Sequence, residues 1–328
     1  MQPQGNTWSA PPSEGALQDW TLFLPLDGRM FGRVKKRLQD PRPISSGPNS
    51  DVWKCDIGPS EQSNKYSGPV AVKVVRRYVE GERDQVKALE RINARLNQEV
   101  ITWAGVRCRN TVPLIGVMFF PVHALILPWF DRGSLPIYLH RYPAVNRLKL
   151  ICDIARGLEH LHLCTPIIVH ADLKPENVLI NDRGDALITD FGMATFLGED
   201  NWYTPSHLHG GTMHWMAPEI FLGKTDMRSR TGDVYAFGSL SCYIITGRIP
   251  DIYKFLSQMI GTTNNSPEPI DKWHKHPELQ GPFGGFIAGI IRQCWSLVPE
   301  NRPPMQSIVK ELLDLREKRE SLVPRKWN

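Results

Sequence analysis

The apolar and polar positions divide the chain into a strand-rich stretch and a later helical one. From about residue 42 to residue 127 the pattern is mostly that of short strands, and the run 70–75 is apolar except at Lys73. A strand repeats every two residues, so one face of this run carries Ala71, Lys73 and Val75. The other face carries only valines. We therefore expect a small sheet that presents Lys73 on one face.

One helix is predicted inside this stretch, from about residue 84 to residue 103. Glu99 projects from its apolar stripe, and a carboxylate that faces a core needs a cationic partner. Lys73 on the preceding strand is the candidate. The stripe recurs at spacings of three and four, as in a helix with one buried face, at Val86, Leu89, Ile92, Leu96, Val100 and Trp103.

Beyond Gly133 the apolar spacing becomes helical. One helix leads toward His170, and others are predicted at 235–246, 286–295 and 305–315. The segment 235–246 is apolar on nearly all sides, which is typical of a central helix. The expected fold class is α+β, with a small antiparallel sheet lobe that holds one main helix and a larger, mostly helical lobe.

Composition and charge narrow the class of protein. The chain has 328 residues, 41% of them apolar and 22% charged, which suits one large domain or two lobes. The net charge of +5 is mild, and the basic run at 33–37 favours a solvated surface or linker over a nucleic-acid patch. No apolar run approaches the roughly 20 residues that cross a bilayer. We expect no nucleic-acid partner and no membrane segment.

The start of the chain and its cysteines indicate a compartment. Residues 1–38 are rich in Pro, Gly, Gln and Ser around an apolar island at 20–24, so we expect a partly disordered extension with at most one docked segment. The chain begins with neither a basic start nor an apolar h-region. The six cysteines lie far apart, which favours a reducing cytosol over a zinc or disulfide framework. A cytoplasmic protein is expected, with nuclear entry left open.

Three motifs carry the chemistry. Residues 170–177 read His-Ala-Asp-Leu-Lys-Pro-Glu-Asn, residues 190–192 read Asp-Phe-Gly, and residues 217–219 read Ala-Pro-Glu. One of them occurs easily by chance, but all three in order within 50 residues (219 − 170 + 1) is a strong signal. They supply what phosphoryl transfer from ATP requires: a carboxylate for the attacking hydroxyl, a lysine for the moving phosphoryl group, and two magnesium ligands.

On these motifs the chain resembles a eukaryotic-type protein kinase of the tyrosine-kinase-like group, with serine/threonine specificity. The resemblance runs from about residue 44 to residue 315. It implies the two-lobed protein-kinase fold. The expected divisions are an extension at 1–38, a kinase domain at 39–318 (small lobe 39–130, large lobe 131–318) and a tail at 319–328.

The resemblance assigns catalytic and metal-binding roles. Asp172 would accept a hydrogen bond from the substrate hydroxyl and take its proton late in the reaction. Lys174 would neutralise charge on the transferring phosphoryl group. Asn177 and Asp190 would hold magnesium through hard oxygen atoms. The implied cofactors are therefore ATP and Mg²⁺.

The resemblance also assigns the nucleotide contacts. Lys73 would reach the α- and β-phosphates while paired with Glu99. Leu127 would guard a narrow deep pocket. Val52 and Ala71 would contact one face of the adenine ring, and Leu179 would contact the other face. The main-chain amide of Phe130 would donate a hydrogen bond to the adenine.

The loop that covers the phosphates departs from the family pattern. Of the three glycines that the family has there, only Gly47 is present, and Ser45 and Ser50 stand at the other two positions. Glycine permits positive φ and close backbone approach to phosphates. The departure leaves weakened nucleotide binding open but does not imply its loss.

The resemblance assigns structural rather than catalytic roles to two acidic residues. Glu219 should form a buried salt bridge with Arg302, and Asp233 should brace the backbone of the catalytic loop.

Ala171 replaces an arginine that in the family binds a phosphate on the activation segment, so phosphorylation of that segment is expected to be dispensable. Lys174 with Thr212 resembles the serine/threonine pattern, which favours serine/threonine specificity and leaves dual specificity for tyrosine open. The segment's candidate acceptors are Thr195, Thr204 and Ser206.

The first interpretation is an ATP- and magnesium-dependent kinase that phosphorylates Ser and Thr hydroxyls of protein substrates, as in intracellular signalling. The alternative is a pseudokinase, a scaffold that binds nucleotide weakly without transfer. The serine-substituted loop favours the alternative, and the intact catalytic residues oppose it. A small-molecule phosphotransferase comes third, because Asp233 and Arg302 belong to protein-kinase large lobes. The sequence carries no signal for an oligomeric state.

Overall fold

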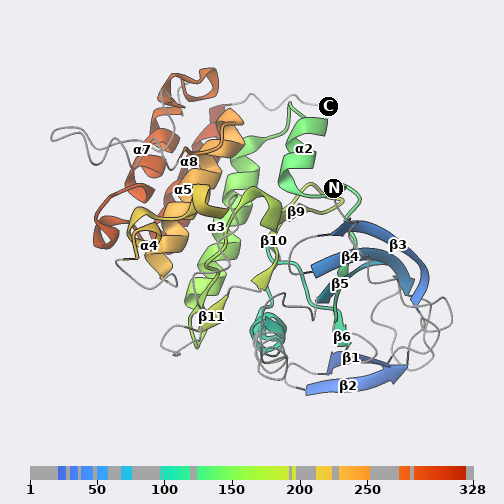
Figure 1. Cartoon of the computed structure of the whole chain (residues 1–328). Helices are drawn as coiled ribbons and strands as arrows, with labels where there is room; N and C mark the ends of the chain where they lie inside the picture. Colours follow the sequence, from blue (N-terminus) through green and yellow to red (C-terminus); the bar gives the residue numbers. More distant parts are fainter. Residues whose placement is uncertain are drawn as a thin grey trace, which may run out of the picture. The chain divides into compact units, whose positions relative to one another are not determined.

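An antiparallel sheet and a group of helices make up separate units of the chain, shown in the computed structural model of Figure 1. Contacts divide the chain into a small unit, 1–107 with 113–129, and a large unit, 108–112 with 130–328. The expected α+β fold, strands first and helices after, is confirmed. The structure describes residues 21–26, 30–35, 38–46, 50–57, 68–75, 97, 99–118, 124–191, 194–196, 212–223, 229–251, 273–280 and 284–322.

The sheet of the small unit has the strand order β2-β1-β6-β7-β5-β4-β3, and all its neighbouring strands are antiparallel. Hairpin partners such as β4 and β5 are adjacent, whereas β6 and β7 lie beside strands from earlier in the chain. The strands are β1 (Thr21–Leu26), β2 (Met30–Lys35), β3 (Leu38–Ser46), β4 (Ser50–Ile57), β5 (Gly68–Val75), β6 (Gly116–Met118) and β7 (Ala124–Pro128).

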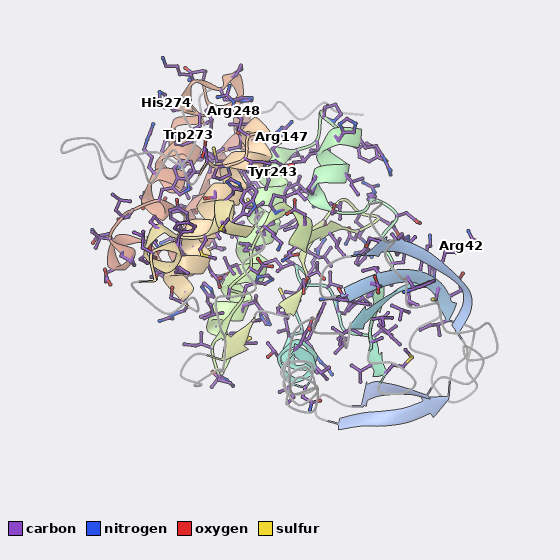
Figure 2. The ribbon with its side chains drawn as sticks, viewed as in Figure 1. Arg42, Arg147, Tyr243, Arg248, Trp273 and His274 are labelled. Carbon is purple, nitrogen blue, oxygen red and sulfur yellow. The ribbon has the colours of Figure 1, made fainter. Side chains whose placement is uncertain are left out.

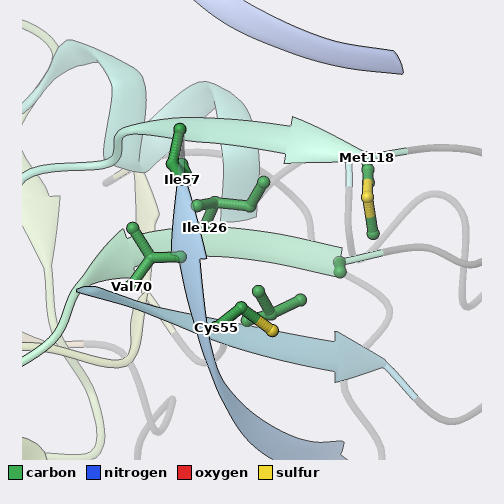
Figure 3. Packing of buried hydrophobic residues seen from close by; sticks show 7 residues of the cluster. Cys55, Ile57, Val70, Met118 and Ile126 are labelled. Atoms are coloured by element: carbon green, nitrogen blue, oxygen red, sulfur yellow. The ribbon is translucent and has the colours of Figure 1, made fainter. Parts of the chain in front are cut away.

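The two faces of β5 differ as the strand period predicts. Lys73 pairs with Val52 in β4 and with Leu125 in β7, and residues paired across antiparallel strands share a face. The opposite face holds an apolar core, drawn in Figure 3. Burial of this core holds the strand in one register, because a slip by one residue would expose its valines. The core residues are Cys55, Ile57, Val70, Val72, Met118, Ala124 and Ile126.

Residues 97 and 99–105 of the small unit are helical, where the sequence predicts the end of a helix. Val100 and Trp103 are buried at 4% and 1% exposure. Glu99 is buried with them at 6%, so it belongs to the buried face of the helix. The earlier part of the predicted helix, 84–96, lies outside the described residues.

The strands β1 and β2 lie within the segment that the sequence assigns to an extension. They pair from Thr21↔Lys35 to Leu26↔Met30, and Phe23 of β1 pairs with Val117 of β6. The apolar island therefore becomes a sheet strand with a second strand beside it. The sheet starts earlier than the strand pattern indicates, whereas the boundary at residue 39 stays a prediction.

The large unit is mostly helical, as expected. Helix α5 (Arg230–Thr246) begins where the Ser229 side chain accepts a hydrogen bond from Gly232 N at 2.9 Å, and it ends at Gly247, with φ 69°. Its residues are nearly all buried, as the sequence predicts for a central helix. Within the described residues of the large unit, the other helices are α2 (Leu135–Arg141), α3 (Arg147–Leu163), α4 (Pro218–Phe221), α7 (Gly284–Cys294) and α8 (Met305–Leu322).

Helix α3 packs against α5 and α8. Arg147 at its start donates a hydrogen bond to the main-chain oxygen of Ile244 in α5, next to Tyr243 (Figure 2). A methyl group added at Gly157 would lie 2.6 Å from Asn110 O, so only glycine lets that loop approach the helix. Within the described residues, no helix combines the length and apolar character needed to cross a membrane.

Short strands and 3-10 turns connect these helices. The two-stranded sheets are β10-β9 and β11-β8, and both are antiparallel. The strands are β8 (Ile168–Val169), β9 (Val178–Ile180), β10 (Ala186–Ile188) and β11 (Thr195–Phe196). The 3-10 turns are Pro175–Asn177, Thr212–Trp215, Trp273–Lys275, Pro277–Leu279 and Pro299–Asn301.

Candidate active site

Two polar side chains of the loop between β8 and β9 contact the carboxylate of a third residue in that loop, Asp172. Lys174 Nζ lies 2.7 Å from Asp172 Oδ2, and Asn177 Nδ2 donates to the same oxygen at 3.0 Å. Asn177 Nδ2 also donates to the main-chain oxygen of Asp172 at 2.8 Å. The loop therefore fixes the position and orientation of Asp172.

The second carboxylate oxygen of Asp172 differs from the first in its hydrogen bonding. Its Oδ1 is buried and accepts no hydrogen bond from any described residue, while the side chain as a whole is 11% exposed. A buried carboxylate oxygen without a donor is costly, and in native proteins such atoms call for a functional explanation. A hydroxyl group that approaches this oxygen would supply the absent donor.

The backbone before Asp172 is held by Asp233 at the start of α5. Its Oδ2 accepts from His170 N at 2.8 Å, and its Oδ1 accepts from Ala171 N at 2.9 Å. His162 Nε2 lies 2.9 Å from the same Oδ2. Ala171 has φ 63°, an uncommon conformation for a residue with a side chain, and these hydrogen bonds stabilise it. Asp233 thus braces the catalytic loop as the sequence predicts.

Asn177 and Asp190 lie on neighbouring segments. Thr189 N, directly before Asp190, donates to Asn177 O at 3.0 Å, and Asp190 itself has φ 64°. The amide nitrogen of Asn177 is directed at Asp172, which leaves its side-chain oxygen for a cation. An amide oxygen and a carboxylate are hard donors of the kind that Mg²⁺ prefers, so this pair fits the expected metal.

Phe191, directly after Asp190, packs against His170 of the loop that carries Asp172. Its side chain is fully buried, and its ring centroid lies 5.5 Å from that of His170. His170 Nε2 in turn lies 3.0 Å from Thr189 O. The segment with Asp190 and the loop with Asp172 are therefore packed and hydrogen-bonded together.

In the small unit, Lys73 Nζ lies 3.2 Å from Glu99 Oε1. Their side chains are 15% and 7% exposed. Burial makes each charge depend on the other, since an unpaired charge in this position would be expensive. This is the pairing that the strand and helix periods predict.

Comparison with known proteins adds an independent finding. A family model described as protein tyrosine and serine/threonine kinase matches residues 38–312. The chain belongs to this family. The match includes each of the site residues above, from Lys73 to Asp233.

Individual relatives are protein kinases by name, two of them serine/threonine kinases and one a serine/threonine/tyrosine kinase. The chain is 29% identical to the human "Receptor-interacting serine/threonine-protein kinase 3", over 75% of this chain and 46% of that one. It is 27% identical to "Serine/threonine-protein kinase STY46" of Arabidopsis thaliana, over 89% and 47%. It is also 27% identical to "Serine/threonine/tyrosine-protein kinase HT1" of the same plant, over 93% and 70%. The kinase chain spans about half the length of the first two relatives.

The predicted adenine contacts of the kinase fall into both units. In the small unit, Val52 pairs with Lys73, and Ala71 pairs with Lys54 and Leu127, so they share the face of Lys73. In the large unit, Phe130 O accepts from Gly133 N at 3.0 Å, and Leu179 bridges to Ser134 in the same turn. Gly47 lies outside the described residues. That both groups meet around one nucleotide stays a prediction.

The structural pair of the kinase large lobe is present. Arg302 Nη1 and Nη2 donate to Glu219 Oε1 and Oε2 at 2.5 and 2.8 Å. The side chains are 0% and 9% exposed. Of the activation-segment positions, Thr195 and Thr212 are described only in their backbone, whereas Thr204 and Ser206 lie outside the described residues.

An ionic network around two buried carboxylates of the large unit, Asp153 and Asp185, was not predicted from the sequence. Lys149 Nζ lies 2.7 Å from both Asp153 Oδ2 and Asp185 Oδ1, and Arg109 Nη2 lies 3.2 Å from Asp185 Oδ2. Asp153 Oδ2 also accepts from Ala186 N at 3.1 Å. The network ties α3 to the turn before β10. The spacing of Lys149 and Asp153 was a visible signal, but nothing local indicated Asp185.

The network gives a pH-dependent stability. Burial alone would raise the pKa of Asp185, but hydrogen bonds from Lys149, Asn181 and Arg109 outweigh it and lower the pKa from 3.8 to about 2. A carboxyl whose pKa falls on folding stabilises the fold above its unfolded pKa, and this contribution is lost as the pH falls from about 4 toward 2. We expect Asp185→Asn to lower the free energy of unfolding by about 2 kcal/mol at pH 6 and by clearly less at pH 3.

Denaturant titrations at both pH values measure this difference. Asp182→Asn is the matched control, because Asp182 is an exposed aspartate in the same turn. It should leave the free energy of unfolding within about 0.5 kcal/mol of the parent at either pH. An Asp185→Asn penalty that is equal at pH 6 and pH 3 would contradict the lowered pKa.

Proposed function

We propose that this protein is an ATP- and Mg²⁺-dependent kinase that phosphorylates Ser and Thr hydroxyls of protein substrates. The observation that carries the proposal is Asp172, whose Oδ2 is held by Lys174 and Asn177 while its buried Oδ1 has no donor among the described residues. A substrate hydroxyl is the group that completes this arrangement. Serine/threonine specificity, a cytoplasmic location and a role in signalling belong to the same proposal.

The chain's own residues supply three functions. Asp172 orients the hydroxyl and accepts its proton at a carboxylate oxygen late in the transfer. Lys174, 2.7 Å from Asp172, carries a positive charge toward the phosphoryl group as negative charge develops on its oxygens. Asn177 and Asp190 would hold Mg²⁺, which supplies charge neutralisation on the phosphates when it is bound.

Lys73 and its partner prepare the nucleotide. With Glu99 at 3.2 Å, the ammonium group of Lys73 is held on one face of the sheet rather than left to rotate. A fixed cation there can contact the α- and β-phosphates without further ordering cost. Val52, Ala71, Phe130 and Leu179 are assigned to adenine in this proposal.

The pseudokinase alternative rests on Ser45 and Ser50 in the phosphate loop. It is not favoured, because Lys73, Glu99, Asp172, Lys174 and Asn177 are all present, and each makes an ion pair or hydrogen bond within this set. A serine in place of a glycine keeps a small side chain, so it weakens phosphate binding less than a larger residue would.

Transfer of labelled phosphate from ATP to a generic protein tests the proposal. We expect Mg²⁺-dependent labelling of serine and threonine by the purified full chain. Lys73→Met should lower kcat/KM by about 10²-fold or more in protein that is still folded, because a methionine fills the volume but cannot bind phosphate. Its melting temperature should fall, because Glu99 stays buried without its partner.

Lys310→Met provides the matched control, since Lys310 is exposed on α8. It should leave kcat/KM unchanged. Labelling that is equal in Lys73→Met and in the parent would refute the role of the ion pair. Labelling confined to tyrosine would refute the serine/threonine specificity.

A further inference from the structure

The hairpin of β1 and β2 lies outside the kinase match yet belongs to the kinase sheet. The family match begins at residue 38, whereas the two strands end at Lys35. Six residue pairs join them, from Thr21↔Lys35 to Leu26↔Met30. An isolated two-stranded hairpin is marginally stable in water, so its docking partner matters.

That partner is β6, which has only three residues. Phe23 of β1 pairs with Val117 at the centre of β6, and all three residues of β6 are buried. Without β1, this short strand would lie at the edge of the described sheet with β7 as its sole neighbour. Edge strands with few pairing residues open easily, and β1 gives β6 a second neighbour.

From β6 a single row of paired residues leads to Lys73. Val117 pairs with Leu125 in β7, and Leu125 pairs with Lys73 in β5. Val117 and Leu125 are 1% and 0% exposed. Because directly paired residues share a face of the sheet, this row connects the hairpin's docking position with the catalytic lysine through closely packed side chains.

The segment after Glu99 also leads to β6. Its helix ends at Gly105, where Val106 N donates to Trp103 O at 3.1 Å. Directly before β6, Ile115 N donates to Ile126 O in β7 at 2.8 Å. A displaced β6 would therefore act on both partners of the 3.2 Å ion pair, on Lys73 through the sheet and on Glu99 along the chain.

The residue types of β2 suit a strand that ends a sheet. Its sequence is Met-Phe-Gly-Arg-Val-Lys, and β2 is the first strand in the sheet order. Charged residues on an edge strand oppose the addition of a further strand. The hairpin is thus suited to hold the sheet from outside rather than to recruit another chain.

We propose that the β1–β2 hairpin is a positioning element for the kinase reaction: by pairing with β6 it fixes the sheet and helix that carry Lys73 and Glu99. The inference rests on the proposed function of Lys73. It makes activity depend on a segment outside the matched kinase domain, so any event that releases the hairpin lowers phosphoryl transfer.

Proline substitution in the full chain tests the proposal. Phe23→Pro removes a main-chain donor at the one residue of β1 that pairs with β6, whereas Gln18→Pro places the same residue before the strand. In Phe23→Pro we expect amide hydrogen exchange at 116–118 and 99–105 to rise about tenfold, with α3 and α5 unchanged. We expect kcat for phosphoryl transfer to fall by a similar factor. Gln18→Pro should match the parent in both measurements.

Two results would overturn the proposal. One is unchanged exchange at 116–118 in Phe23→Pro, and the other is raised exchange with unchanged kcat. If Phe23→Pro does not fold, Phe23→Gly weakens the strand more mildly and should give the same pattern at smaller size. An inactive parent would refute the proposed kinase function, while the exchange measurement would still show whether the hairpin supports β6.

Discussion

Substitution of Asp172 by Asn is expected to lower the rate of phosphoryl transfer by about 10²–10⁴-fold. Asparagine has nearly the same shape and can still accept a hydrogen bond, so the fold of the loop should survive. It loses the negative charge that faces Lys174 at 2.7 Å, and it cannot accept the proton of the substrate hydroxyl. The loss should therefore appear in kcat, with a smaller effect on the KM for ATP, since Asp172 is not assigned to the nucleotide.

The control for this substitution is Asp182→Asn. Both are aspartates of the same region, but Asp182 is exposed, so its neutralisation should leave kcat unchanged. Steady-state kinetics with a protein substrate measure both variants, and thermal unfolding shows whether Asp172→Asn remains folded. A kcat equal to that of the parent in folded Asp172→Asn would refute the role of this carboxylate.

The sequence predicted best where a short-range rule decides the geometry. Lys73 could be assigned to a face of β5 because alternation along a strand is fixed by its ladder, and the pairs with Val52 and Leu125 follow that alternation. Asp172, Lys174 and Asn177 lie within one turn of chain, so their closeness required only a local loop. For these positions the pattern and the family resemblance indicated the same arrangement.

Interactions across long stretches of chain came from resemblance alone. The hydrogen bonds from His170 and Ala171 to Asp233 join residues about 60 positions apart, and no periodicity predicts such a contact. The pairing of Glu219 with Arg302 is of the same kind. In both, the charged residue lies among apolar neighbours, which signals burial but does not name the partner.

The hairpin of β1 and β2 was not predicted because its strands are stabilised by partners far along the chain. Its sequence contains Pro25 and Gly28, which interrupt a strand pattern, and its composition resembles that of a linker. The pairing of Phe23 with Val117 joins this segment to the sheet, and Val117 lies about 90 residues further along the chain. Strand propensity depends on such neighbours more than on the segment itself.

The network around Lys149 was not predicted because its residue types are those of an exposed surface, although its carboxylates are buried. Lys149 and Asp153 have the spacing of an exposed helical ion pair, which usually contributes little. Asp185 adds a second carboxylate to this pair, and both carboxylates are buried, with Asp153 and Asp185 at 6% and 4% exposure. The turn that carries Asp185 sets this burial, and its position relative to α3 is a tertiary property.

Substitution of Arg302 by Met is expected to destabilise the large lobe by roughly 3–5 kcal/mol, because it leaves the Glu219 carboxylate buried without its partner. Arg302 makes more than the bidentate pair: its Nη1 also donates to Thr231 O at 3.0 Å and its Nε to Ser296 O at 2.9 Å. The guanidinium carbon lies 5.1 Å from the ring centroid of Tyr235. One substitution thus removes donors from three segments and a cation from an aromatic face.

Denaturant unfolding of two further variants separates charge from packing. Arg230→Met is the matched control, because Arg230 is exposed at the start of α5, and it should change the free energy of unfolding by less than about 0.5 kcal/mol. The double variant Glu219→Leu with Arg302→Met removes both charges, so it should recover part of the stability that Arg302→Met loses. A double variant less stable than Arg302→Met would show that the unpaired carboxylate is not the main cause of the lost stability. The loss of the hydrogen bonds to Thr231 and Ser296 would then be the main cause.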